Sequence, residues 1–274
     1  MSIFDAIIQA IIQGLTEFLP VSSSGHLRLY QAITGQSVEE GTFLLVILHL
    51  GTLVAVFIAF WDTIWALIKE FFVLVKDVFT GKFKWSTMNP DRRMILMLII
   101  SLVLLVPFYF FKDVFENINL LVMAGCFLYT SLLLFFANRV KSNKKTVGEM
   151  TVKDAVVVGL FQCVALFPGV SRSGSTISGG LFSGLEKETA VRYSFVLGIP
   201  AILGGCLSEL GDALDGEMVV NVPATIIGFV VAAFVGIAAI KLVKWLVKSD
   251  NFHVFSIYTF LVSLFTLGVW IYQH

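Results

Sequence analysis

Charged residues are scarce in this chain of 274 residues. Aspartate, glutamate, lysine and arginine together make up 14% of it, and the formal net charge is +0. Without a basic excess the chain lacks the positive surface on which nucleic-acid binding depends, so we expect no nucleic-acid partner. Cysteine is also rare. The three cysteines, Cys126, Cys163 and Cys206, are odd in number and lie in apolar segments, which argues against a disulfide framework.

A basic stretch is missing from the first twenty residues, which instead contain Asp5, Gln9, Gln13 and Glu17. A secretory signal peptide begins with positive charge and continues with an uninterrupted apolar run. We therefore expect these residues to belong to the folded protein rather than to a cleaved signal.

Hydrophobic residues dominate the rest of the sequence. They make up 57% of the chain and give it a mean hydropathy of +0.90, which is far above the values of soluble domains. A bilayer core of about 30 Å needs roughly 20 apolar residues for each crossing helix. We predict an all-α polytopic membrane protein with a single integral membrane domain and about six transmembrane helices, at residues 42–60, 93–111, 118–137, 191–209, 220–246 and 253–272.

Two further apolar segments, residues 3–19 and 153–167, are too short to cross a bilayer. Each runs directly into a loop rich in serine and glycine, and another short apolar piece follows the loop. This pattern is typical of a re-entrant helical hairpin, which enters and leaves the membrane by the same face. The alternative is a full crossing helix with a bend.

Lysine and arginine collect in the segments 61–92 and 138–153, which the positive-inside rule places in the cytoplasm. The loop that contains Asp212, Asp215 and Glu217 has no basic residue and is expected to face outward. Three crossings then separate the two hairpins, and an odd number inverts the second relative to the first.

These orientations predict two inverted-topology repeats, at about residues 1–137 and 151–274, joined by a basic cytoplasmic linker at about 138–150. The first hairpin would enter from the outside, and the tips of the two hairpins would meet between the repeats. The basic and aromatic segment 61–85 is interpreted as an amphipathic helix on the membrane surface.

The two serine-rich loops are copies of one motif. Residues 20–26 read PVSSSGH and residues 168–174 read PGVSRSG, so that proline, valine, two serines and glycine coincide after one inserted glycine. Arg172 occupies the place of Ser23. Hydroxyl-rich backbone is costly at membrane depth unless it is buried in protein or lines a wet cavity. The paired copies therefore predict one central site.

The first helix brings polar side chains to that site. Asp5, Gln9, Gln13 and Glu17 recur every four residues and so share one helix face. A carboxylate inside a membrane is costly and usually faces a cavity, where it has a functional role or pairs with a cation. We expect Glu17 to be a site residue and Asp5 to lie in headgroup water near the terminus.

The second loop has the residues of an anion-binding site. Arg172 lies among hydroxyl and glycine residues, and Ser22 of the first loop corresponds to Ser171. The members of the expected phosphate-binding set are Ser22, Ser171, Ser173, Gly174, Thr176 and, from the first helix, Gln13. Backbone amides and hydroxyls at a helix start bind oxygens, and a guanidinium binds phosphate with two parallel hydrogen bonds. The alternative is that Arg172 serves only to pair with Glu17.

Together the loops predict phosphoryl transfer. Arg172 would stabilise charge on the phosphoryl oxygens, and Glu17 would orient or deprotonate the nucleophile. His26 is a candidate nucleophile or acid and base, and Ser23 is the competing nucleophile. A transporter or flippase for a lipid remains the alternative function, because transporters share inverted repeats and broken helices.

The stretches GLTEFLPVSSSGH at 14–26 and PGVSRSGST at 168–176 resemble the two signature motifs of the bacterial undecaprenyl-diphosphate phosphatase family, the bacitracin-resistance proteins. The resemblance extends to chain length, motif order and segment pattern. It implies an enzyme of the bacterial plasma (inner) membrane, active on its outer side, that removes the terminal phosphate of undecaprenyl diphosphate for carrier-lipid recycling in cell-wall synthesis. The family's catalytic or phosphate-binding positions match Glu17, Ser23, His26, Arg172, Ser173 and Thr176.

Gln13 departs from the family pattern, because it occupies the first position of the paired-carboxylate motif. The resemblance implies a divalent cation, Mg²⁺ or Ca²⁺, with Glu17 as a candidate ligand. Gln13 is a doubtful ligand, since it offers only a neutral carbonyl oxygen.

Two features of the apolar helices allow more than one interpretation. We interpret His49 as forming a structural hydrogen bond between helices, with a role as an extra ligand as the alternative. Gly198, Gly204 and Gly205 allow close helix packing, either within one subunit or in a homodimer.

Overall fold

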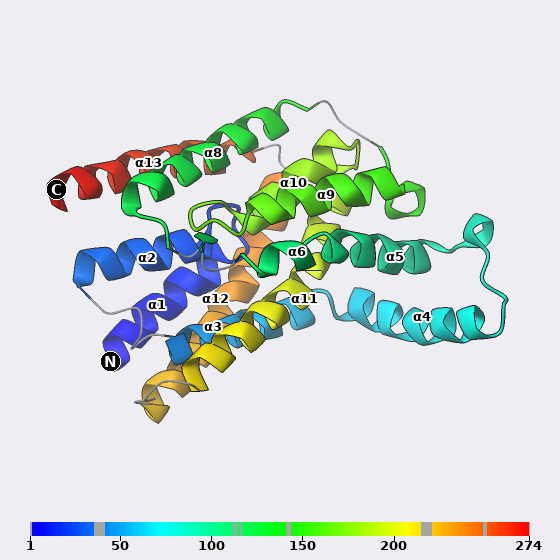
Figure 1. The fold of residues 1–274 in the computed structure, drawn as a ribbon, viewed down its shortest axis with the longest axis horizontal. Helices are drawn as coiled ribbons and strands as arrows, with labels where there is room; N and C mark the ends of the chain where they lie inside the picture. Colours follow the sequence, from blue (N-terminus) through cyan, green and yellow to red (C-terminus); the bar gives the residue numbers. More distant parts are fainter. Residues whose placement is uncertain are drawn as a thin grey trace.

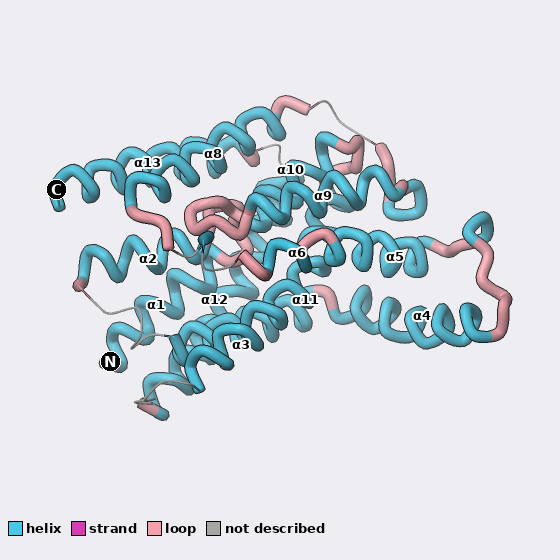
Figure 2. Tube along the Cα trace, viewed as in Figure 1, coloured by secondary structure: helices cyan, strands magenta, loops and turns pink. Residues whose placement is uncertain are grey.

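The computed structural model describes residues 2–35, 42–111, 114–115, 117–140, 144–214, 221–248 and 251–273. The elements in these ranges are helices, apart from one isolated bridge between Lys145 and Leu185. This confirms the predicted all-α class, and Figure 2 shows how little of the trace is loop. Both termini lie at one end of the molecule, and the turn from α4 (Trp61–Phe79) to α5 (Pro90–Val103) lies at the opposite end (Figure 1).

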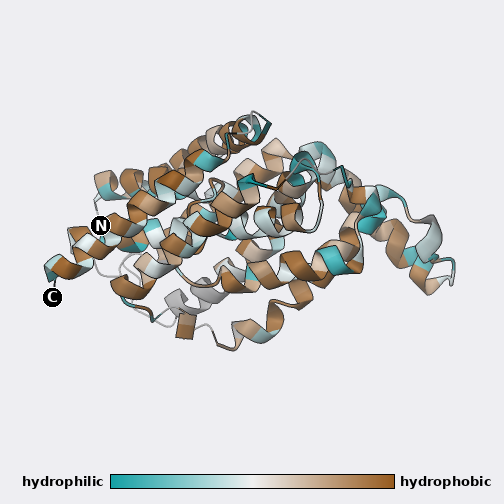
Figure 3. Ribbon diagram, turned by 90° about the horizontal axis from the view of Figure 1, so that it is seen from above, coloured by the Kyte–Doolittle hydropathy of each residue, from teal (hydrophilic) through white to brown (hydrophobic). Residues whose placement is uncertain are grey.

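Four helices in the described part of the chain are long and apolar enough to cross a membrane. They are α8 (Leu120–Asn138), α11 (Lys187–Leu214), α12 (Val222–Lys248) and α13 (His253–Gln273). They correspond to the last four predicted crossings. Hydrophobic residues run along most helices, and several hydrophilic segments gather at the end remote from the termini (Figure 3). The chain is thus a multi-pass membrane protein.

A fifth candidate span is bent. α3 (Thr42–Ala59) meets α4 at an angle of 87°. α4 exposes aromatic side chains such as Trp61 and Phe72. Arg92 at the start of α5 forms ion pairs with Glu70 and Asp77 of α4, at 2.6 and 2.9 Å. The interpretation of segment 61–85 as a helix on the membrane surface stays a prediction.

The predicted crossing at 93–111 is not one continuous helix. α5 ends at Val103, and only the short α6 (Val106–Tyr109) follows. Pro107 gives the physical reason, because a proline inside a helix lacks an N–H donor and its ring clashes with the carbonyl four residues earlier, here that of Val103. The prediction of a single helix here is wrong, and the total of about six crossings stays a prediction.

Two helix pairs have the lengths expected for hairpins. α1 (Ile3–Thr16) and α2 (Ser23–Thr34) have 14 and 12 residues, and α9 (Val152–Val164) and α10 (Arg172–Phe182) have 13 and 11. At about 1.5 Å per residue each helix is well short of the roughly 30 Å of a bilayer core. The two helices of each pair also pack on one another.

The packing joins the two halves of the chain. α1 packs against α12 and α9 packs against α5, so each hairpin contacts a helix from the other half. α3 pairs with α11, and α8 lies beside α13. The inverted-repeat division stays a prediction, and Asp215 and Glu217 of the expected outer loop lie outside the described residues.

Candidate active site

The tips of the two hairpins meet, as the repeated motif predicts. The backbone N–H of Gly169 donates to Ser22 Oγ at 3.0 Å, and Ser173 Oγ donates to the carbonyl oxygen of Leu19 at 3.2 Å. The approach requires glycine, because a Cβ on Gly25 would lie 2.8 Å from the backbone nitrogen of Gly169. Ser22 and Gly169 are 147 positions apart in the sequence, yet their loops form one structure.

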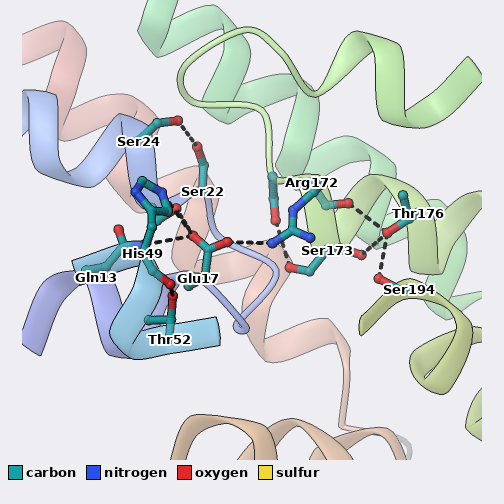
Figure 4. A network of polar contacts seen from close by, with 12 residues as sticks. Gln13, Glu17, Ser22, Ser24, His49, Thr52, Arg172, Ser173, Thr176 and Ser194 are labelled. Atoms are coloured by element: carbon teal, nitrogen blue, oxygen red, sulfur yellow. Dashed lines mark hydrogen bonds and ion pairs between the residues drawn. The ribbon is translucent and has the colours of Figure 1, made fainter. Parts of the chain in front are cut away.

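Glu17 lies at the centre of this junction, at the C-terminal end of α1 (Figure 4). Its Oε1 accepts a hydrogen bond from Arg172 Nη2 at 2.5 Å. Its Oε2 accepts from Ser23 Oγ at 2.6 Å and from Gln13 Nε2 at 3.0 Å, and His49 Nε2 lies 3.9 Å away. Only 7% of Glu17 is exposed. The buried carboxylate is thus held by one cation and two neutral donors.

The loop after Glu17 is held in place by ring packing and hydrogen bonds. Phe18 is buried and its ring packs edge-on against Phe195, with 5.7 Å between the centroids. Ser22 has a positive φ of 72°, a conformation that costs energy for a residue with a side chain. Its Oγ accepts hydrogen bonds from Gly25 and Gly169, so the hydroxyl of Ser22 joins the two loops.

Arg172 begins α10 and reaches Glu17 from the second loop. Its guanidinium passes over Gly198 of α11, where an added Cβ would lie 2.0 Å from Nη1. The absence of a side chain at Gly198 therefore leaves the space that the guanidinium needs.

Two adjoining cavities of about 50 and 190 Å³ surround the pair, and both are lined by Glu17, Ser23, Ser24, Ala165 and Arg172. Six of the nine residues that line the smaller cavity belong to the two serine loops. The larger one continues to apolar side chains, which are Leu105, Leu166, Ala201, Ile202 and Cys206. The site therefore has a small polar end and an apolar side.

Two further residues, His49 and Gln162, line the larger cavity. The sequence indicated a structural role for His49 and no role for Gln162. His49 donates through Nδ1 to the carbonyl oxygen of Leu45 at 2.9 Å, a bond within its own helix, and its Nε2 is on the side of Glu17. Gln162 is 2% exposed, and neither its Nε2 nor its Oε1 has a hydrogen-bond partner in the described residues. The sequence signal for Gln162 was its place in the repeat, six residues before Pro168, as Gln13 lies seven before Pro20.

The other predicted site residues take different places. Ser171 Oγ accepts from the N–H of Gly174 and caps α10, and Thr176 Oγ1 donates to the carbonyl of Arg172 while also contacting Ser194 Oγ at 2.6 Å. Thr176 thus joins α10 to α11 rather than lining either cavity.

His26 points away from the cavities. Its Nδ1 donates to the carbonyl oxygen of Ser22 at 2.7 Å, so a neutral ring has its lone pair on Nε2, which accepts from Tyr258 O–H at 2.9 Å. The ring also stacks on Tyr258 and contacts the edge of Phe127. The structure brings Glu17, Ser23 and Arg172 together and places His26 behind Ser22.

The model of the bacitracin resistance protein BacA family matches residues 6–265. The chain belongs to this family. The match includes the Glu17–Arg172 pair and both hairpins except the first residues of α1.

Named members of this family resemble the chain over nearly its whole length. An undecaprenyl-diphosphatase of Alkaliphilus metalliredigens is 40% identical over 96% of this chain and 97% of the relative. An undecaprenyl-diphosphatase of Methanosphaera stadtmanae is 37% identical over 97% and 98%. Undecaprenyl-diphosphatase 4 of Bacillus thuringiensis subsp. konkukian is also 37% identical, over 97% of both chains.

We expect Gly198→Ala to lower activity without unfolding the protein. The new methyl group would displace the guanidinium of Arg172, which is the flexible end of a side chain, and a misplacement of about 1 Å at a reacting centre can cost roughly a hundredfold in rate. The measurement is phosphate release by purified protein of unchanged thermal stability. Gly204→Ala on the same helix is the control, since its Cβ would meet no atom within 4 Å. Equal activity of the two variants would contradict the prediction.

Proposed function

We propose that this chain hydrolyses undecaprenyl diphosphate to undecaprenyl phosphate and inorganic phosphate. The observation that carries the proposal is the junction of Glu17, Ser23 and Arg172 from two separate hairpins, next to a cavity with an apolar side. A diphosphate head on an isoprenoid tail has the same division into a charged and an apolar part. The relatives are undecaprenyl-diphosphatases by name, and this supplies the substrate of the proposal.

In the proposed reaction, Arg172 moves part of its hydrogen bonding from Glu17 to the terminal phosphoryl oxygens. The first N–H groups of α2 and α10 lie beside it and favour negative charge at a helix start. These groups stabilise the charge that develops on the equatorial oxygens during phosphoryl transfer. Arg172 thus has a role beyond pairing with Glu17.

Ser23 is the nucleophile that the geometry favours. Its Oγ already donates to Glu17 Oε2 at 2.6 Å, so Glu17 can accept its proton as Oγ bonds to the terminal phosphorus. The anhydride bond then breaks, and undecaprenyl phosphate leaves with the proton that Glu17 releases to it. Glu17, ionised again, takes a proton from water, whose oxygen bonds to the phosphorus of phosphoserine. The bond from phosphorus to Ser23 Oγ breaks, inorganic phosphate leaves, and the proton returns from Glu17 to Ser23. His26, which contacts Tyr258, serves in this scheme to hold Ser22 through its carbonyl oxygen.

A divalent cation, Mg²⁺ or Ca²⁺, forms part of the proposal. The described residues contain no group of three histidine, cysteine, aspartate or glutamate side chains that could hold a metal. Beside Glu17, however, the carbonyl oxygen of Gln13 is buried without a hydrogen-bond partner, and such an oxygen is a ligand that both cations accept. Glu17 and Gln13 would hold the cation together with oxygens of the diphosphate. When bound, it would neutralise charge on the diphosphate.

We expect chelation to stop phosphate release. With few protein ligands, the cation should be held weakly and exchange readily, because Mg²⁺ and Ca²⁺ affinity depends on the number of charged oxygen ligands. EDTA should abolish activity in purified protein, and an excess of Mg²⁺ or Ca²⁺ over EDTA should restore it. Full activity in EDTA would contradict a requirement for the cation.

The proposed location is the bacterial plasma membrane, with the site open to the outer side. The support is the distribution of lysine and arginine, which places the basic segments 61–92 and 138–153 in the cytoplasm. We also propose a homodimer, because the small residues of α11 allow a second copy of the chain to pack closely.

Reconstituted vesicles test the proposed activity against the alternative of a lipid transporter or flippase. Vesicles that contain the protein and undecaprenyl diphosphate should release inorganic phosphate, and vesicles with Glu17→Gln should not. Movement of the lipid between leaflets without phosphate release would instead support the flippase. Phosphate release at the rate of protein-free vesicles would overturn the proposed hydrolase.

A further inference from the structure

A second cavity, of about 400 Å³, lies away from the Glu17–Arg172 site and shares no lining residue with it. It is formed where α3 ends, α4 begins, α11 begins and α12 ends. Figure 1 shows the end of α3 and the start of α4 beside the start of α11. The proposed reaction uses none of the residues around this cavity.

The lining of this cavity carries an excess of positive charge. Four of its residues are basic and two are acidic: Lys187, Arg192, Lys244, Lys248, Asp62 and Glu188. Nearby cations repel one another in a partly desolvated site, so the arrangement is costly unless an anion binds there.

Two of the basic side chains, Arg192 and Lys244, keep hydrogen-bond donors that no protein group fills in the described residues. The Nε of Arg192 is buried and has no hydrogen-bond partner in the described residues. The ammonium of Lys244 lies 3.8 Å from the centre of the Phe60 ring and 3.4 Å from the carbonyl oxygen of Ala59. A guanidinium and an ammonium at one cavity are typical of phosphate binding.

We propose that this cavity binds the phosphate of an anionic lipid headgroup. The cavity opens where α3 turns by 87° into α4, and Trp61 at this turn is 59% exposed and stacks on Trp65. Exposed tryptophans of this kind lie at the level of the headgroups. Basic pockets between membrane helices on the predicted cytoplasmic side bind such lipids.

The apolar part of the lining distinguishes a lipid from free phosphate. Ile58 and Trp61 border the cavity, and both side chains are exposed on the helix surface. Acyl chains can pack along them there. Inorganic phosphate would use the basic residues alone. A lipid with a single negative phosphate and two acyl chains uses both parts.

The test is a lipid titration of the purified full-length protein, followed by native mass spectrometry. Wild type should bind phosphatidylglycerol more tightly than phosphatidylcholine. Arg192→Gln with Lys244→Gln should weaken phosphatidylglycerol binding by about twenty-fivefold, since each basic residue at a membrane surface contributes roughly fivefold. Lys82→Gln with Lys84→Gln removes the same charge from an exposed loop and should bind as wild type.

A gain of affinity separates the proposal from misfolding. Glu188→Gln removes a carboxylate that interacts with Lys244 and should tighten phosphatidylglycerol binding. Unchanged binding in the Arg192 and Lys244 double variant would overturn the proposal, as would equal loss in the Lys82 and Lys84 control. If inorganic phosphate displaces phosphatidylglycerol at micromolar concentration, the site binds phosphate but the lipid assignment is wrong. Phosphate release from undecaprenyl diphosphate is scored separately, because the lipid site does not depend on it.

Discussion

Arg172→Lys is expected to lower phosphate release from undecaprenyl diphosphate by about a thousandfold. Lysine keeps the positive charge beside Glu17, so the buried carboxylate remains paired. It cannot, however, bind Glu17 Oε1 and the phosphoryl oxygens at the same time with a planar pair of N–H groups. The loss should therefore appear in kcat more than in stability.

The choice of lysine rather than alanine matters for the measurement. Removing the charge altogether would leave Glu17, 7% exposed, as an unpaired buried carboxylate, and breaking a buried pair in this way costs about 3–5 kcal/mol. Arg139→Lys is the matched control, because Arg139 is exposed at the end of α8. If Arg172→Lys turned over at the wild-type rate, the assignment of Arg172 to the phosphoryl group would be wrong.

Glu17→Gln is expected to lower phosphate release by about 10²–10⁴-fold, which is the usual contribution of a positioned general base. The amide has nearly the shape of the carboxylate but cannot accept the proton of Ser23. The hydrogen bonds from Ser23, Gln13 and Arg172 all end on Glu17, so the change alters each of them. Asp5→Asn on the same helix is the control. Asp5 forms the N-terminal capping box of α1 with Ser2 and lies outside both cavities.

A double-mutant cycle makes this second prediction specific. If Glu17 acts by removing the proton of Ser23, then Ser23→Ala and Glu17→Gln remove the same step, and the double variant should be little slower than either single variant. Multiplied losses would show that the two residues act independently. His26→Ala should be less harmful than Ser23→Ala, because His26 contacts Tyr258 and the backbone of Ser22.

Much of the site could be predicted because its signals are local. The duplicated loop motif identified both hairpin tips, and the four-residue spacing of Asp5, Gln9, Gln13 and Glu17 placed them on one helix face. The short apolar segments around the loops indicated the hairpins, which the lengths of α1 and α9 match. These features need only helix periodicity and the thickness of a bilayer.

Other features could not be read in the same way. His49 and Gln162 lie on helices whose other residues are mainly apolar, and a single polar residue there is as compatible with helix packing as with a cavity. His26 belongs to the motif but contacts Tyr258, 232 residues later in the chain. The break after Val103 had a visible signal in Pro107, which the hydropathy of the segment outweighed in the prediction.

The sequence by itself determined that this is an all-helical membrane protein of the BacA family with two serine loops, because composition, apolar length and motif spacing are properties of neighbouring residues. Only the tertiary structure decided which polar residues share a cavity. The ion pair between Glu17 and Arg172 spans 155 residues and depends on the close approach of Gly25 to Gly169 and of Arg172 to Gly198. Such approaches follow from how helices from both halves pack, and no local pattern encodes that packing.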